Sequence, residues 1–111
     1  MEISFTNKKL AKTCSSAKEM QADYGKRMTE KIQQRLTELH GAETLADMRN
    51  LPGARCHELK GNLASKLAVD LVHPDRLVFS PDHDPRPTLP DGGLDWKQVK
   101  KIVIEGIGDY H

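Results

Sequence analysis

Residues 55–81, RCHELKGNLASKLAVDLVHPDRLVFSP, decide the fold that this sequence of 111 residues predicts. Apolar side chains recur at every second position from 67 to 71, and this period is typical of a strand with one buried face. A turn at 73–75 and a second apolar run at 76–79 follow. Because proline cannot donate to a sheet ladder, Pro81 should end the second run. The stretch therefore predicts a β-hairpin.

The residues before this hairpin predict one strand and two helices. Residues 2–6 alternate apolar with polar side chains, as a short strand does. Two amphipathic segments follow over residues 7–23 and 26–40, and Tyr24-Gly25 is the expected break between them. Two antiparallel helices after a strand would form a layer whose apolar stripes face a sheet.

The residues around and after the hairpin predict shorter elements. Apolar positions in residues 45–51 indicate one or two helical turns before the hairpin. Residues 82–96 contain four acidic residues, three prolines and two glycines, so we expect a loop. Asp95 can cap a helical turn. A last strand is expected at 101–105, and 106–111 should form a polar tail.

Length and composition predict a single domain over residues 1–111 with a modest core. Apolar residues make up 37% of the chain and aromatic residues 5%, so a stable partner interface would bury useful surface. No apolar run approaches the roughly 20 residues of a membrane span, and the start lacks a signal-peptide core, so we expect a cytoplasmic protein without membrane contact. Cys14 and Cys56 are expected to be reduced and buried.

The net charge of +1 conceals an uneven distribution. Residues 7–40 carry eight Lys or Arg against four Asp or Glu, and residues 67–96 carry two against six. The cations of the second expected helix are candidates for contact with RNA phosphates. They are Lys26, Arg27, Lys31 and Arg35. The alternative is a solvated helix face with no binding role.

The histidines and cysteines do not have the spacing of a metal site. Cys56 and His57 are adjacent, so in a strand they point to opposite faces, and no CxxC or HxxxH pair occurs. Phosphate-binding loops and nucleophile elbows are also absent from the sequence. We therefore expect neither a metal nor a cofactor.

The remaining polar residues suit metal-free acid-base chemistry. His57, Lys60 and Arg76 flank or belong to the hairpin, and the chain ends in Asp109, Tyr110 and His111. A ribose 2′-OH can attack its own phosphate if one group takes its proton, a cation stabilises the phosphorane charge and an acid protonates the leaving oxygen. Taken singly, Lys60 is more often a solvated turn lysine and Arg76 a salt-bridge partner.

Several motifs together resemble a known family. They are Leu51-Pro52-Gly53, the run from His57 to Asn62, Val72-His73-Pro74, Arg76-Leu77-Val78-Phe79 and the Asp-Tyr-His end. The chain is similar in these to HigB-type toxins of the RelE/ParE superfamily, which belong to type II toxin-antitoxin systems and serve plasmid maintenance. The resemblance implies an α+β fold, with two N-terminal helices on a mostly antiparallel sheet of about four strands.

The same resemblance implies a function. HigB-type toxins are ribosome-dependent endoribonucleases that cleave mRNA and inhibit translation. Each is neutralised by a HigA-type helix-turn-helix antitoxin, and they meet DNA only through that antitoxin. The positions that match catalytic or phosphate-binding groups in HigB-type toxins are His57, Lys60, Arg76, Asp109, Tyr110 and His111.

The sequence departs from this family at two positions. Leu63 stands where relatives commonly have an arginine, and Asp75 where they often have an aromatic residue. Both departures are expected to weaken RNA cleavage. They leave open a second class, a non-catalytic member that acts as a ParE-like gyrase inhibitor or as an antitoxin-binding partner.

Overall fold

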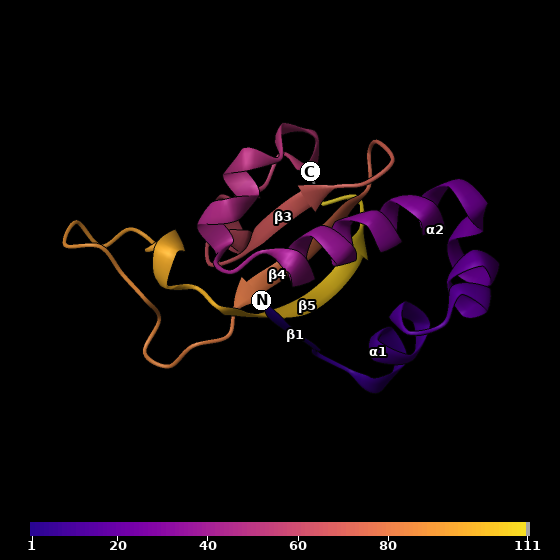
Figure 1. The fold of residues 1–111 in the computed structure, drawn as a ribbon, viewed down its shortest axis with the longest axis horizontal. Coiled ribbons are helices and arrows are strands. Elements are labelled where there is room, and N and C mark those ends of the chain that lie inside the picture. Colours follow the sequence, from indigo (N-terminus) through magenta and orange to yellow (C-terminus); the bar gives the residue numbers. More distant parts are fainter. Residues whose placement is uncertain (111) are drawn as a thin grey trace.

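The computed structural model describes residues 1–110 and consists of one sheet with helices against it (Figure 1). The strands are β1 (Glu2–Phe5), β2 (His57–Glu58), β3 (Leu67–Asp70), β4 (Arg76–Pro81) and β5 (Lys101–Gly108). Their order is β1-β5-β4-β3-β2, with β1 parallel to β5 and every other pair antiparallel. The predicted α+β class and mostly antiparallel sheet are confirmed. The expected number of four strands is wrong, because the two-residue strand β2 is too short to show a sequence period.

The helical layer contains α1 (Lys8–Cys14) and α2 (Ala17–Gly41). The helix expected before Tyr24 is split, because the side chain of Ser16 accepts a hydrogen bond from the N–H of Glu19 and so caps a new helix. The predicted break at Tyr24-Gly25 is confirmed as a kink inside α2, where Gly25 has φ 80° and ψ 168°.

Four short 3₁₀ turns complete the regular structure. They are Leu45–Asn50, Pro52–Ala54, Gly61–Leu63 and Trp96–Gln98. The first confirms the helical turns expected near residue 45. The last confirms the expected cap, because the Asp95 side chain accepts from the N–H of Lys97 at 3.2 Å.

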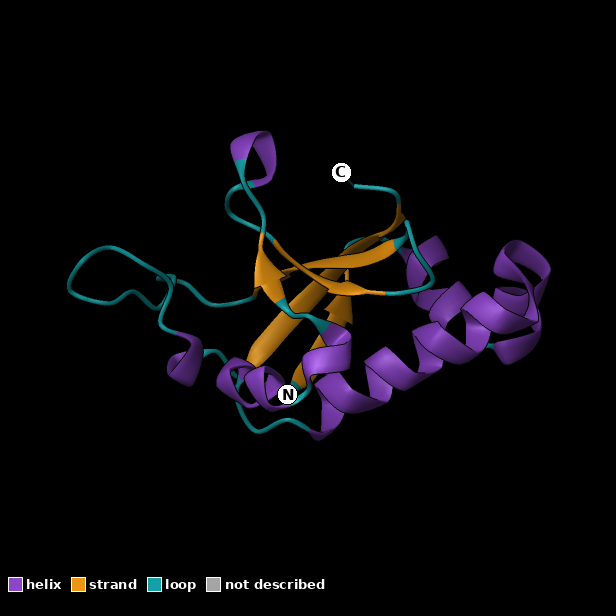
Figure 2. Ribbon diagram, turned by 90° about the horizontal axis from the view of Figure 1, so that it is seen from above, coloured by secondary structure: helices purple, strands orange, loops and turns teal. Residues whose placement is uncertain are grey.

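The helices cover one face of the sheet, as Figure 2 shows from above. Ile32 and Leu39 of α2 are fully buried there, as are Leu67, Phe79 and Ile104 of the strands. This apolar layer is the main core of the protein. No helix within residues 1–110 has the length and apolar character needed to cross a membrane.

The other face of the sheet is also partly covered. Ala68 and Val78 are buried on it with Leu59, and Leu63 and Tyr110 pack against them. The expectation of a strand with one buried face is therefore wrong for β3, since Ala68 is 0% exposed. Alanine carries little apolar surface, so the alternation in the sequence did not show that this face is covered.

Strand β5 is longer than expected, since it extends to Gly108. Strand β4 ends at Pro81, as expected, although Pro81 still pairs with Ile102 of β5. The next residue, Asp82, donates its N–H to the Lys101 carbonyl at 2.9 Å. The Pro81–Ile102 pair therefore does not require an N–H group from the proline. The acidic segment after it is the predicted loop, which projects from the body of the molecule (Figure 1).

Candidate functional site

An open cavity of about 400 Å³ lies on the sheet face opposite the helices. Four predicted catalytic residues line it, namely His57, Lys60, Arg76 and Tyr110. They come from three segments of the chain, which the sheet brings to one place. Leu59 and Leu63 supply apolar walls.

Strand pairing explains this convergence. His57 in β2 pairs with Ala68 in β3, and Lys60 follows two residues after β2. Arg76 begins β4 and pairs with Gly108 at the end of β5. Tyr110 follows two residues after that strand, so the predicted tail is held beside the hairpin.

A β-bulge in β5 sets the position of Tyr110. Val78 pairs with Gly106 and Phe79 with Ile104, so Glu105 is an extra residue in the ladder. Glu105 accepts hydrogen bonds from Lys66 Nζ at 2.5 Å and Ser80 Oγ at 2.6 Å. Burial opposes ionisation of Glu105, but these hydrogen bonds and the lysine charge lower its pKa on balance.

The bulge places Gly106 beneath the Tyr110 ring. A Cβ atom added at Gly106 would overlap the hydroxyl oxygen of Tyr110, whereas one at Gly108 would lie 3.6 Å from a ring carbon, an ordinary contact. Glycine at position 106 therefore makes room for the phenol. Main-chain atoms of the tail are held as well, since Arg76 Nη1 donates to the Tyr110 carbonyl at 3.4 Å.

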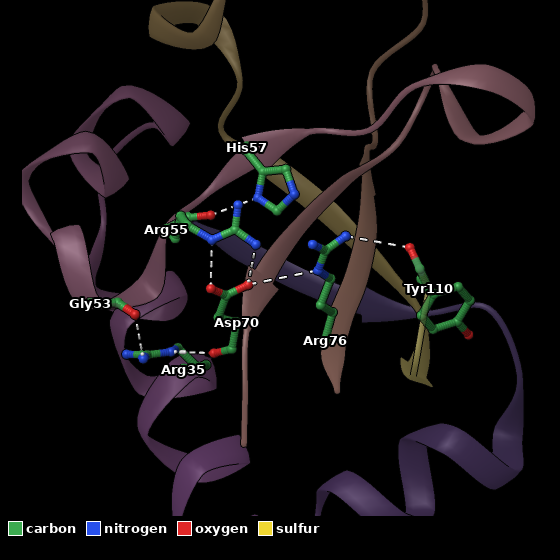
Figure 3. Close-up of polar contacts among 7 residues, drawn as sticks. All are labelled: Arg35, Gly53, Arg55, His57, Asp70, Arg76 and Tyr110. Atoms are coloured by element: carbon green, nitrogen blue, oxygen red, sulfur yellow. Dashed lines mark hydrogen bonds and ion pairs between the residues drawn. The ribbon is translucent and has the colours of Figure 1, made fainter. Parts of the chain in front are cut away.

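Asp70 links two arginines at the edge of the cavity (Figure 3). It accepts hydrogen bonds from Arg55 Nε at 2.7 Å and from Arg55 Nη2 at 3.0 Å. Its Oδ1 lies 3.8 Å from Arg76 Nε, an ion-pair distance beyond hydrogen-bond reach, and that Nε is buried without an acceptor among residues 1–110. Arg76 is thus held near Asp70, and its Nη2 donates no hydrogen bond within residues 1–110, so this group can donate to a phosphate.

The pKa of Asp70 reflects the same arrangement. Partial burial acts to raise it, but the hydrogen bonds and charge of Arg55, followed by the charges of Arg76 and His57, lower it below its usual value. Asp70 is therefore ionised at neutral pH, and its negative charge is directed mainly to Arg55.

Backbone geometry at Arg55 orients His57. Arg55 is the one non-glycine residue with positive φ in the described chain, at φ 45° and ψ 51°. Its carbonyl lies 2.7 Å from His57 Nδ1, so Nδ1 must carry the proton and donate (Figure 3). In the neutral ring, Nε2 then holds the lone pair that can accept a proton.

Lys60 is exposed, and its ammonium group has no hydrogen-bond or ion-pair partner within residues 1–110. Asp109 is exposed and is not among the residues that line the cavity. His111 lies outside the described residues. The cavity thus gathers four of the six predicted catalytic residues.

Arg35 does not lie on the surface, contrary to what its predicted role in RNA contact requires. It is 5% exposed and donates through Nε to the Asp70 carbonyl at 2.7 Å and through Nη2 to the Gly53 carbonyl at 2.8 Å (Figure 3). Its Nη1 pairs with Glu38 at 2.9 Å. The guanidinium therefore joins α2 to β3 and to the turn before β2.

The other three helix cations are accessible. Lys26 and Arg27 are exposed, and Lys31 is half-buried. Arg27 and Lys31 line a groove of about 340 Å³ together with His73 of the β3–β4 turn. This groove is a separate surface from the cavity at Arg76.

The two departures from the family pattern have different positions. Leu63 lines the cavity. Asp75 closes the β3–β4 turn, where its N–H donates to Val72 at 2.8 Å and its carbonyl accepts from Leu71 at 3.0 Å. Asp75 does not line the cavity, so its carboxylate is not placed to oppose a substrate there.

Other reactive groups contribute little to this site. Burial raises the pKa of Cys56 to about 12, so its thiol is not a nucleophile at neutral pH. Both cysteines are free thiols. Within residues 1–110, no three His, Cys, Asp or Glu side chains are grouped so that they could hold a metal ion.

Comparison with known proteins establishes the fold. No protein-family model matches the sequence, and no curated protein matches it. The solved structure of a YoeB/ParE toxin from Agrobacterium tumefaciens is similar over 100% of both chains, with a TM-score of 0.55 and 13% sequence identity. The chain therefore has the fold of a YoeB/ParE toxin, which agrees with the superfamily fold that the motifs implied.

Proposed function

We propose that this protein is the toxin of a type II toxin-antitoxin system and cleaves mRNA on the ribosome. The observation that carries the proposal is the single cavity in which His57, Lys60, Arg76 and Tyr110 converge. Metal-free RNA cleavage needs a base, a cation and an acid, and these can be His57, Arg76 and Lys60, while the Tyr110 ring can stack on a base of the RNA. The YoeB/ParE toxin fold and the HigB-like motifs support it.

In the proposed reaction, Nε2 of His57 takes the proton of the ribose 2′-OH. The 2′ oxygen attacks the adjacent phosphorus, and the bond from phosphorus to the 5′ oxygen of the next nucleotide breaks. Arg76 stabilises the negative charge of the phosphorane. Lys60 adds positive charge and gives a proton to the leaving oxygen. The products are a 2′,3′-cyclic phosphate and a 5′-hydroxyl.

Tyr110 has a different role in this scheme. Its ring lines the cavity while its hydroxyl lies over Gly106. The ring face is therefore suited to stack on a base of the substrate, which is worth about 1 to 3 kcal/mol per base. His111 follows directly and remains a candidate for proton transfer.

The implied partners follow from the same proposal. A HigA-type antitoxin would cover the toxin, and the ribosome would present the mRNA. Lys26, Arg27 and Lys31 are accessible to ribosomal RNA on the helical side of the molecule. Arg35 is excluded from that surface by its burial.

A second candidate is a non-catalytic member of the superfamily, a ParE-like gyrase inhibitor or an antitoxin-binding partner. Leu63 favours it, because an apolar side chain lines the cavity where the resemblance implies an arginine. Asp70 also places a negative charge 3.8 Å from Arg76. Induction of the protein in cells separates these candidates, since a nuclease stops translation, a gyrase inhibitor stops DNA replication and an antitoxin-binding partner stops neither.

Cleavage of mRNA on programmed ribosomes tests the proposal directly. His57→Ala and Arg76→Ala should each lower the cleavage rate about 10²- to 10⁴-fold. Lys97→Ala, on the exposed 3₁₀ turn at Trp96–Gln98, is the matched control and should cut at the wild-type rate. Intact mRNA after incubation with the wild-type protein would rule out the nuclease, and equal rates for all variants would rule out this site.

A further inference from the structure

A second cavity, of about 510 Å³, lies on the other side of Tyr110. Its walls include Tyr24, Tyr110, Lys9, Asp23, Leu10 and Ile107. Tyr110 belongs to both cavities, so the two sites are neighbours that share one aromatic wall. The helical residues that line the second cavity do not line the first one.

The shared wall depends on Gly106. Because position 106 has no side chain, the Tyr110 phenol lies close against β5, with its hydroxyl over the glycine. Gly106 lines the second cavity together with Tyr24. Tyr24 comes from the opposite side, directly before the kink at Gly25 in α2.

Tyr24 and Tyr110 both line the second cavity. Burial raises the pKa of Tyr24, and charge interactions with Cys14, Asp23, Tyr110 and Asp75 raise it further. Tyr24 is therefore uncharged at neutral pH and does not repel a nucleic acid. Its phenol ring offers a second aromatic surface across the cavity from Tyr110.

The charges of the cavity favour a neutral ligand with N–H donors. Lys9 is opposed by Asp23 and Glu105, so an isolated anion gains little there. Glu105 is engaged by Lys66 and Ser80. Asp23 is exposed and its carboxylate has no hydrogen-bond partner among residues 1–110, so the carboxylate is available as an acceptor.

We propose that this second cavity holds the nucleobase next to the scissile phosphate, stacked between Tyr24 and Tyr110. Asp23 accepts a hydrogen bond from an amino group of that base. A base with an exocyclic amino group is preferred over one without it. This assignment rests on the proposed ribonuclease function, whose reactive cavity is the adjacent one.

Binding of a short RNA tests the assignment without any cleavage. The probe is a trinucleotide with a 2′-deoxy sugar at the cut position and 2-aminopurine as the 5′ or the 3′ neighbour, because 2-aminopurine has an amino group and loses fluorescence when stacked. The wild-type protein should quench one of the two probes. Tyr24→Ala should abolish that quenching and weaken binding about tenfold, in the range expected for one stacked base.

Two conservative variants and a control sharpen the result. Tyr24→Phe keeps the ring and should quench as the wild type does, whereas Asp23→Asn should reduce the preference for 2-aminopurine over unsubstituted purine. Lys97→Ala should leave both signals unchanged, and thermal melts establish that each variant is folded. No quenching of either probe by the folded wild-type protein, or equal quenching by Tyr24→Ala, would overturn the assignment.

Cleavage on programmed ribosomes separates this inference from the proposed function. An abasic neighbour should reduce cleavage by the wild-type protein about tenfold and leave cleavage by Tyr24→Ala unchanged. If neither the abasic site nor Tyr24→Ala changes the cleavage rate, the assignment of a base to the second cavity is refuted, and the proposed nuclease function is not. If the wild-type protein does not cleave at all, the nuclease proposal fails and the fluorescence result still decides whether the cavity binds a base.

Discussion

Asp70 and Arg76 lie 3.8 Å apart, close enough for an ion pair but too far for a hydrogen bond. The short bonds of Asp70 go to Arg55 instead, at 2.7 and 3.0 Å. Arg55 therefore takes the hydrogen bonds of the carboxylate, and Nη2 of Arg76 is left to donate to a phosphate. The single negative charge of Asp70 is thus shared by two positive charges, those of Arg55 and Arg76.

Replacing Asp70 with asparagine should strengthen binding of single-stranded RNA about fivefold at low salt. A unit charge about 4 Å away contributes about 1 kcal/mol in water, and the variant removes that charge from beside Arg76. The measurement is the Kd for a short RNA by fluorescence anisotropy. Asp82→Asn, in the exposed loop, is the control for net charge. Weaker binding by Asp70→Asn would show that Asp70 instead helps to orient Arg76.

The lowered pKa of Asp70 makes the fold less stable in acid. Because the folded state binds this proton less readily than the unfolded state, the ionised carboxylate stabilises the fold above its unfolded pKa. That stabilisation is lost as the pH falls through the lower, folded pKa. Urea melts between neutral pH and pH about 3 should show a smaller loss of stability for Asp70→Asn than for the wild type. Parallel pH profiles would contradict this.

Gly106→Ala should displace Tyr110 and lower RNA cleavage, whereas Gly108→Ala should have a much smaller effect. A Cβ at position 106 overlaps the Tyr110 hydroxyl, and one at position 108 makes an ordinary contact. Loss of the stacking ring costs about 1 to 3 kcal/mol, or about 5- to 150-fold in rate. Cleavage assays with the two variants, beside thermal melts, make the comparison. Equal activities of the two variants would mean that the position of the Tyr110 ring does not depend on the missing side chain at Gly106.

Arg35→Met should destabilise the fold by about 1.5 to 3 kcal/mol, because the Asp70 and Gly53 carbonyls lose a charged donor. The free energy of unfolding from urea melts measures this loss. Lys26→Met removes a cation from the exposed part of the same helix and should change stability by less than about 0.5 kcal/mol. If the two variants have the same stability, the buried guanidinium does not hold α2 to the sheet.

Charge reversal at Lys26 and Arg27 should weaken cosedimentation with ribosomes, most strongly at low salt. Lys97→Glu with Lys100→Glu changes the net charge by the same amount at exposed positions near the other end of the sheet. The control pair should bind ribosomes more tightly than the helix pair. If both pairs reduce binding equally, net charge rather than this helix determines ribosome affinity.

The sequence motifs identify four of the residues that line the candidate cavity. His57, Lys60, Arg76 and Tyr110 all line the cavity. Arg55 and Asp70 were missed, since their roles depend on a left-handed backbone conformation and on strand register. No local pattern reveals either feature.

Other differences have equally physical causes. Arg35 was placed on the surface from its charge, although its spacing from Ile32 and Leu39 sets it on the buried side of α2. Strand β2 and the bulge at Glu105 are fixed by pairing with distant residues. Helical stripes and the hairpin could be predicted because their signals are local.

The position of β5 in the sheet determines when, during synthesis of the chain, the candidate site can assemble. This strand is added late in synthesis, yet it lies between β1 and β4, and Glu2 pairs with Lys101. A nascent chain that lacks residues 101–108 cannot close its sheet, and contacts so distant in sequence form slowly. Tyr110 reaches His57 and Arg76 only after β5 has paired. Under the proposed function, the ribosome that makes this protein is therefore not exposed to the assembled site during most of translation.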